Sequence, residues 1–216
     1  MRRPPLRPAA RLAAALLASG ALLTGCTPPP VGDAGAAGAA GAAGASPTAV
    51  AAPASEYSLY DLPSAWRDQR GDTVHLPDLA GKVRVVAMVY TSCQATCPLI
   101  VAELKRVEGA LAPEQRDSVG FVLVSLDPER DTPGRLAAWA AQTRLDPARW
   151  TLLAGDDDAV RELAASLDVR YQAQPDGELA HTNALTVLDR AGGIAHRQPG
   201  LGESDATVRA LRALLR

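Results

Sequence analysis

A nearly unbroken run of apolar and β-branched residues, Lys82-Val-Arg-Val-Val-Ala-Met-Val-Tyr90, leads directly into Thr-Ser-Cys93-Gln-Ala-Thr-Cys97-Pro98. The first run has almost no polar alternation, so it predicts a strand that is covered on both faces. Apolar residues then recur at helical spacing from Ile100 to Leu111, and Pro113 predicts the end of that helix. The two cysteines therefore lie where a buried strand passes into a helix.

The rest of the chain continues to alternate between strands and helices. The predicted elements are, in order, a strand at 119–126, a helix opened by Asp131-Thr132-Pro133 that ends near Thr143, a strand at 150–153, a helix capped by Asp156 that runs through Leu167, a hairpin at 182–189 and 194–197, and a helix from Ser204 or Asp205. Helices of about 10 to 15 residues between strands indicate an α/β sheet with parallel crossovers. The closing hairpin and last helix favour a thioredoxin-like fold, a central mixed sheet flanked by helices. A hairpin at 66–76 extends it at the N-terminus.

The first 25 residues have the composition of an export signal. They contain four arginines and no acidic residue, and an apolar segment runs from Leu12 to about Leu23. This segment is shorter than the roughly 20 residues that a membrane-spanning helix needs, so it predicts a signal peptide at 1–25. It ends in Leu23-Thr-Gly-Cys26, which resembles the lipobox of bacterial lipoproteins and implies that Cys26 is lipidated. An ordinary secretory signal followed by a chance cysteine is the alternative.

Residues 26–55 are predicted to be a flexible linker between the signal peptide and a globular domain at 56–216. They are almost entirely Ala, Gly, Pro, Ser and Thr, and lack the large apolar side chains that would offset the entropy cost of ordering. A coil of this length reaches roughly 30 Å. Beyond residue 25 the chain has 18 basic and 24 acidic residues, a net charge of −6. This balance excludes the basic surface that nucleic-acid binding requires.

Cys93 and Cys97 are placed for chemistry, because a helix N-terminus stabilises a thiolate through its unpaired N–H groups and its dipole. If the helix already includes Cys93, a spacing of four residues puts both sulfurs on one face, where they could bind one ion or form a disulfide. Two thiolates prefer Cu(I) first and zinc second. A structural disulfide closes too short a loop to constrain much. A thiol redox pair is the other alternative, although thioredoxin-type pairs have two intervening residues and this chain has three.

Two thiolates leave a copper ion short of a ligand, and the candidates for a third are the histidines. His75 is predicted on a surface hairpin and His196 on a strand beside Arg197, so contact with solvent is expected for both. His181 stands immediately before the strand at 182–189, at the end of a polar loop. It is the strongest candidate, although spacing alone leaves its role open.

Three motifs together resemble the SCO/SenC family of copper-binding proteins. They are Thr91-Ser-Cys93-Gln-Ala-Thr-Cys97-Pro98, Ser125-Leu-Asp127-Pro-Glu-Arg-Asp-Thr-Pro133 and His181-Thr182, in the family's order and approximate spacing. The similarity covers roughly residues 58–216. It implies a thioredoxin-like fold, copper binding by Cys93, Cys97 and His181, and delivery of copper to the dinuclear copper site of cytochrome c oxidase. Many members have an acidic residue between the cysteines, where this chain has Gln94-Ala95-Thr96; this departure concerns partner docking and preference for Cu(II), not the ligand set.

We therefore expect a copper metallochaperone rather than an enzyme, carrying Cu(I) and able to take Cu(II). Its expected partners are the copper-site subunit of the oxidase, other copper chaperones and the membrane, to which Cys26 tethers it on the periplasmic side of the inner membrane. The alternative is a thiol–disulfide oxidoreductase that reduces the oxidase's copper-ligand cysteines with Cys93 and Cys97 alone. A peroxiredoxin-like peroxidase fits less well, because those enzymes have Pro and Thr just ahead of the reactive cysteine. The Asp131-Thr132-Pro133 stretch is interpreted as a helix cap without a chemical role.

Overall fold

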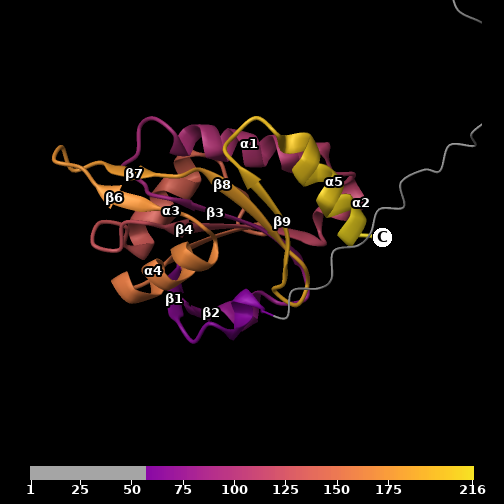
Figure 1. The fold of residues 1–216 in the computed structure, drawn as a ribbon, viewed down its shortest axis with the longest axis horizontal. Helices are drawn as coiled ribbons and strands as arrows, with labels where there is room; N and C mark the ends of the chain where they lie inside the picture. The colour runs from indigo at the N-terminus through magenta and orange to yellow at the C-terminus, as the bar shows by residue number, and fades with distance from the viewer. Residues whose placement is uncertain (1–56) are drawn as a thin grey trace, which may run out of the picture. The chain divides into compact units, whose positions relative to one another are not determined.

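A seven-stranded mixed sheet forms the centre of the part of the chain that the computed structural model describes, residues 57–216 (Figure 1). Its strand order is β2-β1-β5-β4-β3-β8-β9, and β6 and β7 form a separate two-stranded ribbon. The strands are β1 (Ala65–Asp68), β2 (Thr73–His75), β3 (Val83–Val89), β4 (Val119–Ser125), β5 (Trp150–Ala154), β6 (Tyr171–Ala173), β7 (Leu179–His181), β8 (Ala184–Leu188) and β9 (Ile194–Pro199). The predicted signal peptide (1–25), Cys26 and the linker (26–55) lie outside the described residues.

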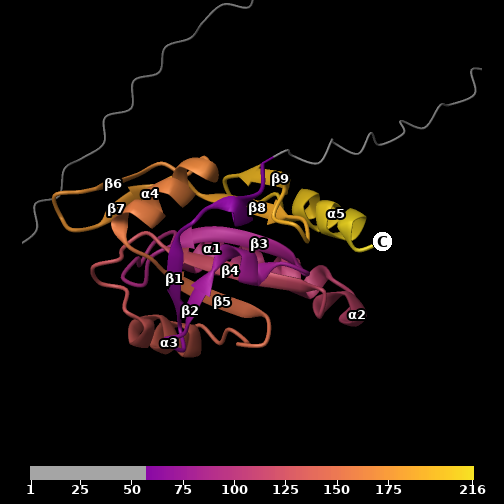
Figure 2. The same cartoon turned by 90° about the horizontal axis from the view of Figure 1, so that it is seen from below.

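The three central strands β3, β4 and β5 run parallel, and the strands on either side of them are antiparallel. β3 pairs with β4 so that Val89 lies opposite Ser125, and β8 and β9 follow as an antiparallel hairpin beside β3. On the other side, the β1–β2 hairpin pairs with β5, next to which it lies in Figure 2. The carboxyl ends of β3 and β4 therefore meet at one edge of the sheet, the edge at which open α/β sheets bind ligands.

Helices cover both faces of the sheet. The helices α1 (Cys97–Ala110), α3 (Pro133–Gln142) and α5 (Ser204–Leu214) share one apolar core with the sheet. The other face is covered by α4 (Asp157–Ser166) and the short 3-10 helices η1 (Leu59–Asp61) and η2 (Leu76–Leu79), and α4 lies across the sheet from α1 in Figure 1. A four-residue helix, α2 (Pro113–Arg116), precedes β4. Within residues 57–216, no helix has the length and hydropathy that crossing a bilayer requires.

The burial of β3 on both faces confirms the prediction from its sequence. Val85 and Ala87 belong to the core under α1, whereas Val86 and Met88 belong to the core under α4. Each of these four side chains is at most 4% exposed. Since successive side chains of a strand point to opposite faces, only a strand without polar alternation suits this central position.

The structure also contains a hairpin that the sequence analysis treats as a polar loop. β6 and β7 pair antiparallel, with Tyr171 opposite His181, around a turn at Gly177, which has a φ of +83°. His181 is therefore the last residue of β7 instead of the residue ahead of the next strand. The two strands have three residues each and are largely exposed, so they carry no apolar alternation that would reveal them.

Gly155→Ala is expected to destabilise the domain by about 1–3 kcal/mol, because overpacking a full core forces side chains and backbone to move. A Cβ at this position would lie 2.7 Å from the ring of Trp66, which is 1% exposed. The free energy of unfolding in urea measures the effect.

Gly109→Ala is the matched control. This glycine lies within α1 and a Cβ there would meet nothing within 4 Å, so alanine should stabilise the domain by up to about 1 kcal/mol. Replacing glycine with alanine should thus lower the free energy of unfolding at position 155 and raise it at position 109. Equal effects on unfolding at both would contradict this account of the packing around Trp66.

Candidate metal centre

Cys93, Cys97 and His181 come together at the carboxyl edge of the parallel strands. One ligand atom from each, the two sulfurs and an imidazole nitrogen, all lie within 4.8 Å of one another. Cys93 is in the loop that follows β3, Cys97 is the first residue of α1, and His181 ends β7. The structure thus brings together the three residues that the sequence analysis selects.

The two cysteines do not share one face of a helix, so the condition on which that expectation rested is not met. The helix α1 begins at Cys97, and Cys93 lies one turn ahead of it. The loop folds back so that the N–H of Cys97 donates to the sulfur of Cys93, with 3.4 Å between N and Sγ. A backbone hydrogen bond at the helix N-terminus, rather than helical spacing, therefore brings the two sulfurs together.

Cys93 is the more acidic of the two thiols. Burial opposes its ionisation, since the side chain is only 5% exposed. Hydrogen bonds from the N–H and the thiol of Cys97 and from the hydroxyl of Thr96, 3.6 Å from the sulfur, outweigh burial and lower the pKa of Cys93 to about 7. A substantial fraction of Cys93 is therefore thiolate at neutral pH.

Cys97 is fully buried and holds its proton more tightly. Burial raises the pKa of the Cys97 thiol well above its ordinary range. The neighbouring Cys93 and the buried carboxylate of Asp131 act in the same direction, because each places negative charge near the sulfur. The pair therefore consists of one thiol that ionises readily and one that requires a cation to replace its proton.

His181 presents an unprotonated ring nitrogen to this pair. Its Nδ1 lies 3.2 Å from the carbonyl oxygen of Thr182, which can only accept, so Nδ1 carries the hydrogen. That leaves the lone pair on Nε2, which is 3.8 Å from the sulfur of Cys97. Burial also lowers the pKa of His181, so the ring is neutral at pH 7. This is the tautomer and charge state in which histidine binds metals.

Tyr90 positions the hairpin that carries His181 through hydrogen bonds, a role that was not predicted from the sequence. Its hydroxyl donates to Oε2 of Glu178 at 2.7 Å and accepts from the N–H of Leu179 at 3.3 Å. Its ring meets that of His181 edge to face, with 5.9 Å between the centroids. The end of β3 thus holds the β6–β7 hairpin beside the cysteines.

Asp131 is the second residue whose role was missed. The cap of α3 is Thr132, whose side chain accepts from the N–H of Arg135, so the predicted cap is confirmed for Thr132 and not for Asp131. The Asp131 side chain turns inward and accepts from the backbone N–H of Thr91 at 3.0 Å and from the hydroxyl of Ser125 at 2.6 Å. The motif at 125–133 is therefore in direct contact with the first residue of the cysteine motif at 91–98.

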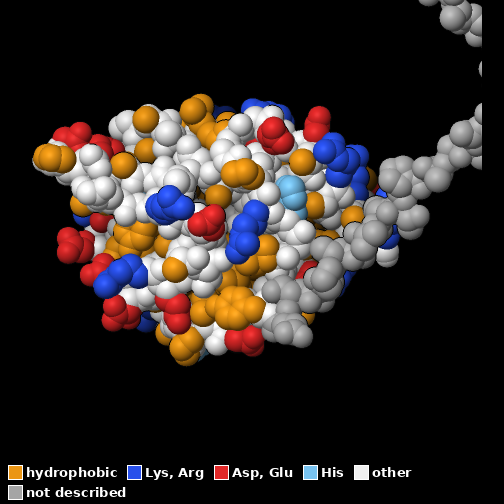
Figure 3. Space-filling view, viewed as in Figure 1, with side chains coloured by type: hydrophobic (Ala, Val, Ile, Leu, Met, Phe, Trp, Pro, Cys, Tyr) orange, Lys and Arg blue, Asp and Glu red, His pale blue; other side chains and the backbone are white. Residues whose placement is uncertain are grey.

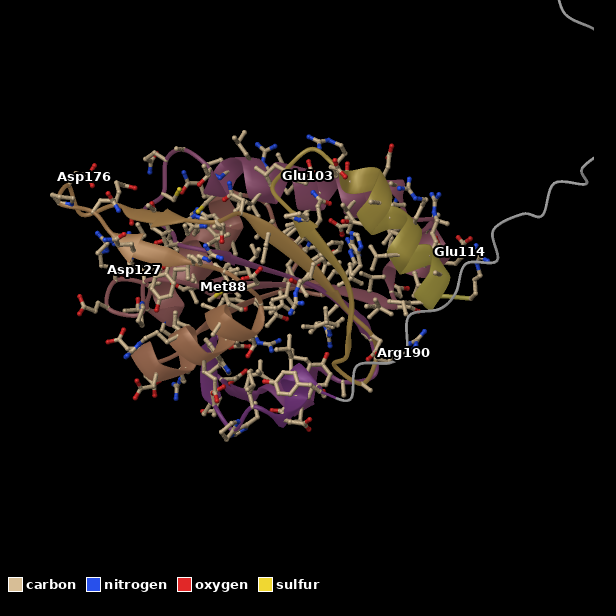
Figure 4. All side chains as sticks on the ribbon, in the orientation of Figure 1. Met88, Glu103, Glu114, Asp127, Asp176 and Arg190 are labelled. Atoms are coloured by element: carbon tan, nitrogen blue, oxygen red, sulfur yellow. The ribbon has the colours of Figure 1, made fainter. Side chains whose placement is uncertain are left out.

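The other two histidines lie outside this cluster. His75 is exposed, with Nδ1 3.8 Å from a carboxylate oxygen of Asp78, and His196 is half-buried on β9. In the described part of the chain, no second group of three Cys, His, Asp or Glu residues is close enough to share an ion. Figure 3 shows Asp and Glu side chains, with Lys and Arg among them, at the end of the domain with the β6–β7 hairpin, where Figure 4 labels Asp127 and Asp176. Asp127 is buried and pairs with Arg130.

The three ligand atoms suit one small soft cation. Two sulfurs and an imidazole nitrogen select copper or zinc over magnesium or calcium, which prefer oxygen. Ligands each about 2.0–2.3 Å from an ion lie at most about 4.6 Å from one another. The 3.8 Å between the sulfur of Cys97 and Nε2 of His181 already falls within that range. The residues present thus fit a three-coordinate metal site.

Comparison with known proteins gives consistent matches. A family model described as SCO1/SenC matches residues 52–216. The chain is 30% identical over 117 residues to the SCO1 protein homolog of Bacillus subtilis, and this alignment covers 54% of the chain and 60% of that relative, less than two thirds of its length. The solution structures of apo Sco1 from Thermus thermophilus are 28% identical with a TM-score of 0.57, covering 76% of this chain and 99% of that one. Copper-bound ScoI from Bradyrhizobium japonicum is 26% identical with a TM-score of 0.57, covering 71% and 98%. These matches confirm the predicted thioredoxin-like fold.

The unequal thiols predict a pH-dependent alkylation pattern in the reduced chain. Because the thiolate is the nucleophile, the rate of modification of Cys93 by a small alkylating reagent should rise with pH and reach half its maximum near pH 7. Cys97 should stay largely unmodified over the same range. Mass spectrometry of peptides after quenching at each pH measures both rates. Cys97→Ser should keep the midpoint, because it retains the backbone N–H and replaces the thiol with a hydroxyl that can also donate to Cys93. A midpoint near pH 9 in the unaltered chain would contradict the assignment.

Proposed function

The chain belongs to the SCO1/SenC family, and we propose that it is a copper metallochaperone that holds its ion with Cys93, Cys97 and His181. The observation that carries the proposal is the convergence of two thiols and one neutral imidazole within 4.8 Å. The same three residues are the ligands that the family resemblance implies. Copper is the cargo of the protein in this proposal.

The chemistry of the donors supports Cu(I) as the principal ion. Soft thiolate ligands favour Cu(I), and a neutral imidazole adds a third ligand without adding charge. The thiolate of Cys93 is available at neutral pH, and Cys97 gives up its proton when the ion binds. Binding therefore releases the proton of Cys97 at neutral pH, so the apparent affinity should fall as the pH falls. The fall should be steeper below the pKa of Cys93, about 7, because a second proton must then leave as well.

The role that the family resemblance supports is delivery of copper to the dinuclear copper site of cytochrome c oxidase. A partner must bring its own ligands to a site where both cysteines are buried but His181 is only half-buried. The half-buried imidazole is therefore the ligand that a partner reaches first. Stepwise exchange would begin there and proceed to the thiolates, and other copper chaperones could load the site by the reverse route.

Copper titration of the purified full-length chain in detergent tests the ligand set. Cys93→Ala and Cys97→Ala should each abolish tight binding of Cu(I), because one thiolate and one imidazole are left. His181→Ala should weaken it by at least about tenfold, or ~1.4 kcal/mol. Competition with a chromogenic Cu(I) chelator gives the affinities and the stoichiometry.

His196→Ala is the matched control, since His196 lies outside the cluster in the described structure. It should bind one Cu(I) with the affinity of the unaltered chain. Unchanged stoichiometry and affinity in the two cysteine variants and in His181→Ala would end the proposal.

A thiol–disulfide oxidoreductase is the second candidate, and the unequal pKa values of Cys93 and Cys97 favour it. In that reaction the Cys93 thiolate attacks a target disulfide, and Cys97 then releases the target as a dithiol and leaves a Cys93–Cys97 disulfide. His181 has no part in these steps. Single-turnover reduction of a disulfide peptide that is equally fast in His181→Ala, together with weak copper binding, would favour this candidate.

The N-terminal residues support a place at the membrane. We propose that residues 1–25 are cleaved as a signal, that Cys26 is lipidated, and that 26–55 tether the domain 56–216 on the periplasmic face of the inner membrane. Cys26→Ser should abolish the lipid mass increment of the mature chain and its partition into detergent, as measured by intact mass and phase separation. A chain that keeps both properties without Cys26 would rule out this anchor.

A further inference from the structure

Asp131 is a buried carboxylate to which the proposed function gives no part. It is 1% exposed, and it lies between β4 and α3 at the edge of the sheet where the cysteine loop leaves β3. No ion pair that involves Asp131 is present in the described part of the chain, and Arg130 next to it pairs with Asp127 instead. A buried carboxylate without a cation must be stabilised by hydrogen-bond donors, so its position depends on where those donors lie.

Three donors meet this carboxylate, and two of them belong to the cysteine loop. Thr91 provides its backbone N–H to Oδ2 at 3.0 Å and its hydroxyl to Oδ1. The third donor is the hydroxyl of Ser125, at the end of β4, 2.6 Å from Oδ2. Asp131 therefore joins the end of β4 to the first residue after Tyr90.

The contact lies two residues ahead of Cys93. The N–H of Cys93 donates to the carbonyl of Tyr90 at 3.3 Å, which closes a tight turn over Thr91. With Thr91 held at both its N–H and its hydroxyl, the turn has one orientation relative to the sheet. The sulfur of Cys93 then meets the N–H of Cys97 at 3.4 Å. The position of one proposed copper ligand thus follows from Asp131 through Thr91.

This arrangement is separate from the capping of α3. Thr132 provides the cap, accepting from the N–H of Arg135 at 3.4 Å, and Pro133 occupies the first turn. Loss of the Asp131 carboxylate would leave that cap in place and would instead leave the donors of Thr91 and Ser125 without their acceptor. The two neighbouring residues therefore serve two different parts of the structure.

We propose that Asp131 is a positioning residue of the metal centre, which holds the loop of Cys93 in the geometry that binds copper. The proposal rests on the proposed function. Asp131 would act on the Cys93 ligand through Thr91, and loss of a residue that orients a metal ligand typically weakens metal binding about 10- to 100-fold.

Asp131→Asn is the informative variant. It keeps the shape of the side chain, but one oxygen becomes an NH2 group that faces donors instead of accepting from them. Cu(I) affinity of the full-length chain, measured by chelator competition, should fall about 10- to 100-fold. In the metal-free chain, hydrogen exchange of the Thr91 amide, read by NMR, should become fast, because that amide is bonded to Asp131 and not to the backbone.

Thr132→Ala is the matched control, since it removes the neighbouring cap and leaves the contacts of Asp131 intact. It should lower the thermal unfolding midpoint while leaving the Cu(I) affinity within about twofold and the Thr91 amide protected. Equal losses of copper affinity in the two variants would overturn the proposal, because the effect would then follow general stability.

Three further outcomes are decisive. If Asp131→Asn fails to fold, Thr91→Val, which removes one donor and leaves the carboxylate, should still lower the Cu(I) affinity; wild-type affinity in that variant would overturn the positioning role. If the unaltered chain binds Cu(I) tightly and a folded Asp131→Asn binds it equally well, only the positioning role fails. If the unaltered chain binds no Cu(I), the proposed function fails and this proposal with it.

Discussion

The parallel pairing of β3 with β4 is the interaction on which the rest of the structure depends. Their ladder extends past the strand ends, where the N–H of Leu126 donates to the carbonyl of Val89 at 2.8 Å. Because both strands leave the sheet at the same edge, the cysteine loop and the loop that carries Asp131 must lie side by side. Hydrophobic burial on both faces holds this pair in the middle of the sheet, so the edge on which the metal centre is built is rigid.

The three residues of the metal centre differ in protonation state at neutral pH. Cys93 ionises near neutral pH, Cys97 keeps its proton because it is buried, and His181 is a neutral ring with its lone pair on Nε2. An incoming cation therefore meets one thiolate and one imidazole before it displaces the proton of the second thiol. This order suits the proposed metallochaperone role, since each ligand would be gained or lost in a separate step.

Strong local patterns in the sequence were sufficient for most of the sheet and for placing the two cysteines after β3, whereas His181 was selected as a ligand only through the family resemblance. The apolar run of β3 and the helical spacing after Ile100 report burial directly, so both elements were predicted. The first residue of α1 was not predicted, although Pro98 in the first turn is the signal that could have located it. The β6–β7 hairpin was missed because its strands are short and contain no fully buried residue. Asp131 was grouped with the cap because Asp is a preferred N-cap residue, whereas in the structure Thr132 caps α3 and Asp131 accepts from Thr91.

We propose that two sulfurs and one nitrogen of this chain bind one copper ion. X-ray absorption at the copper edge of the loaded full-length chain, compared with the loaded His181→Ala variant, tests it most directly because it counts the ligand atoms by type. The account predicts two sulfur scatterers and one nitrogen scatterer in the unaltered chain, with the nitrogen lost or replaced by a solvent ligand in the variant. A first shell without two sulfurs, or an imidazole signature that persists in His181→Ala, would contradict it.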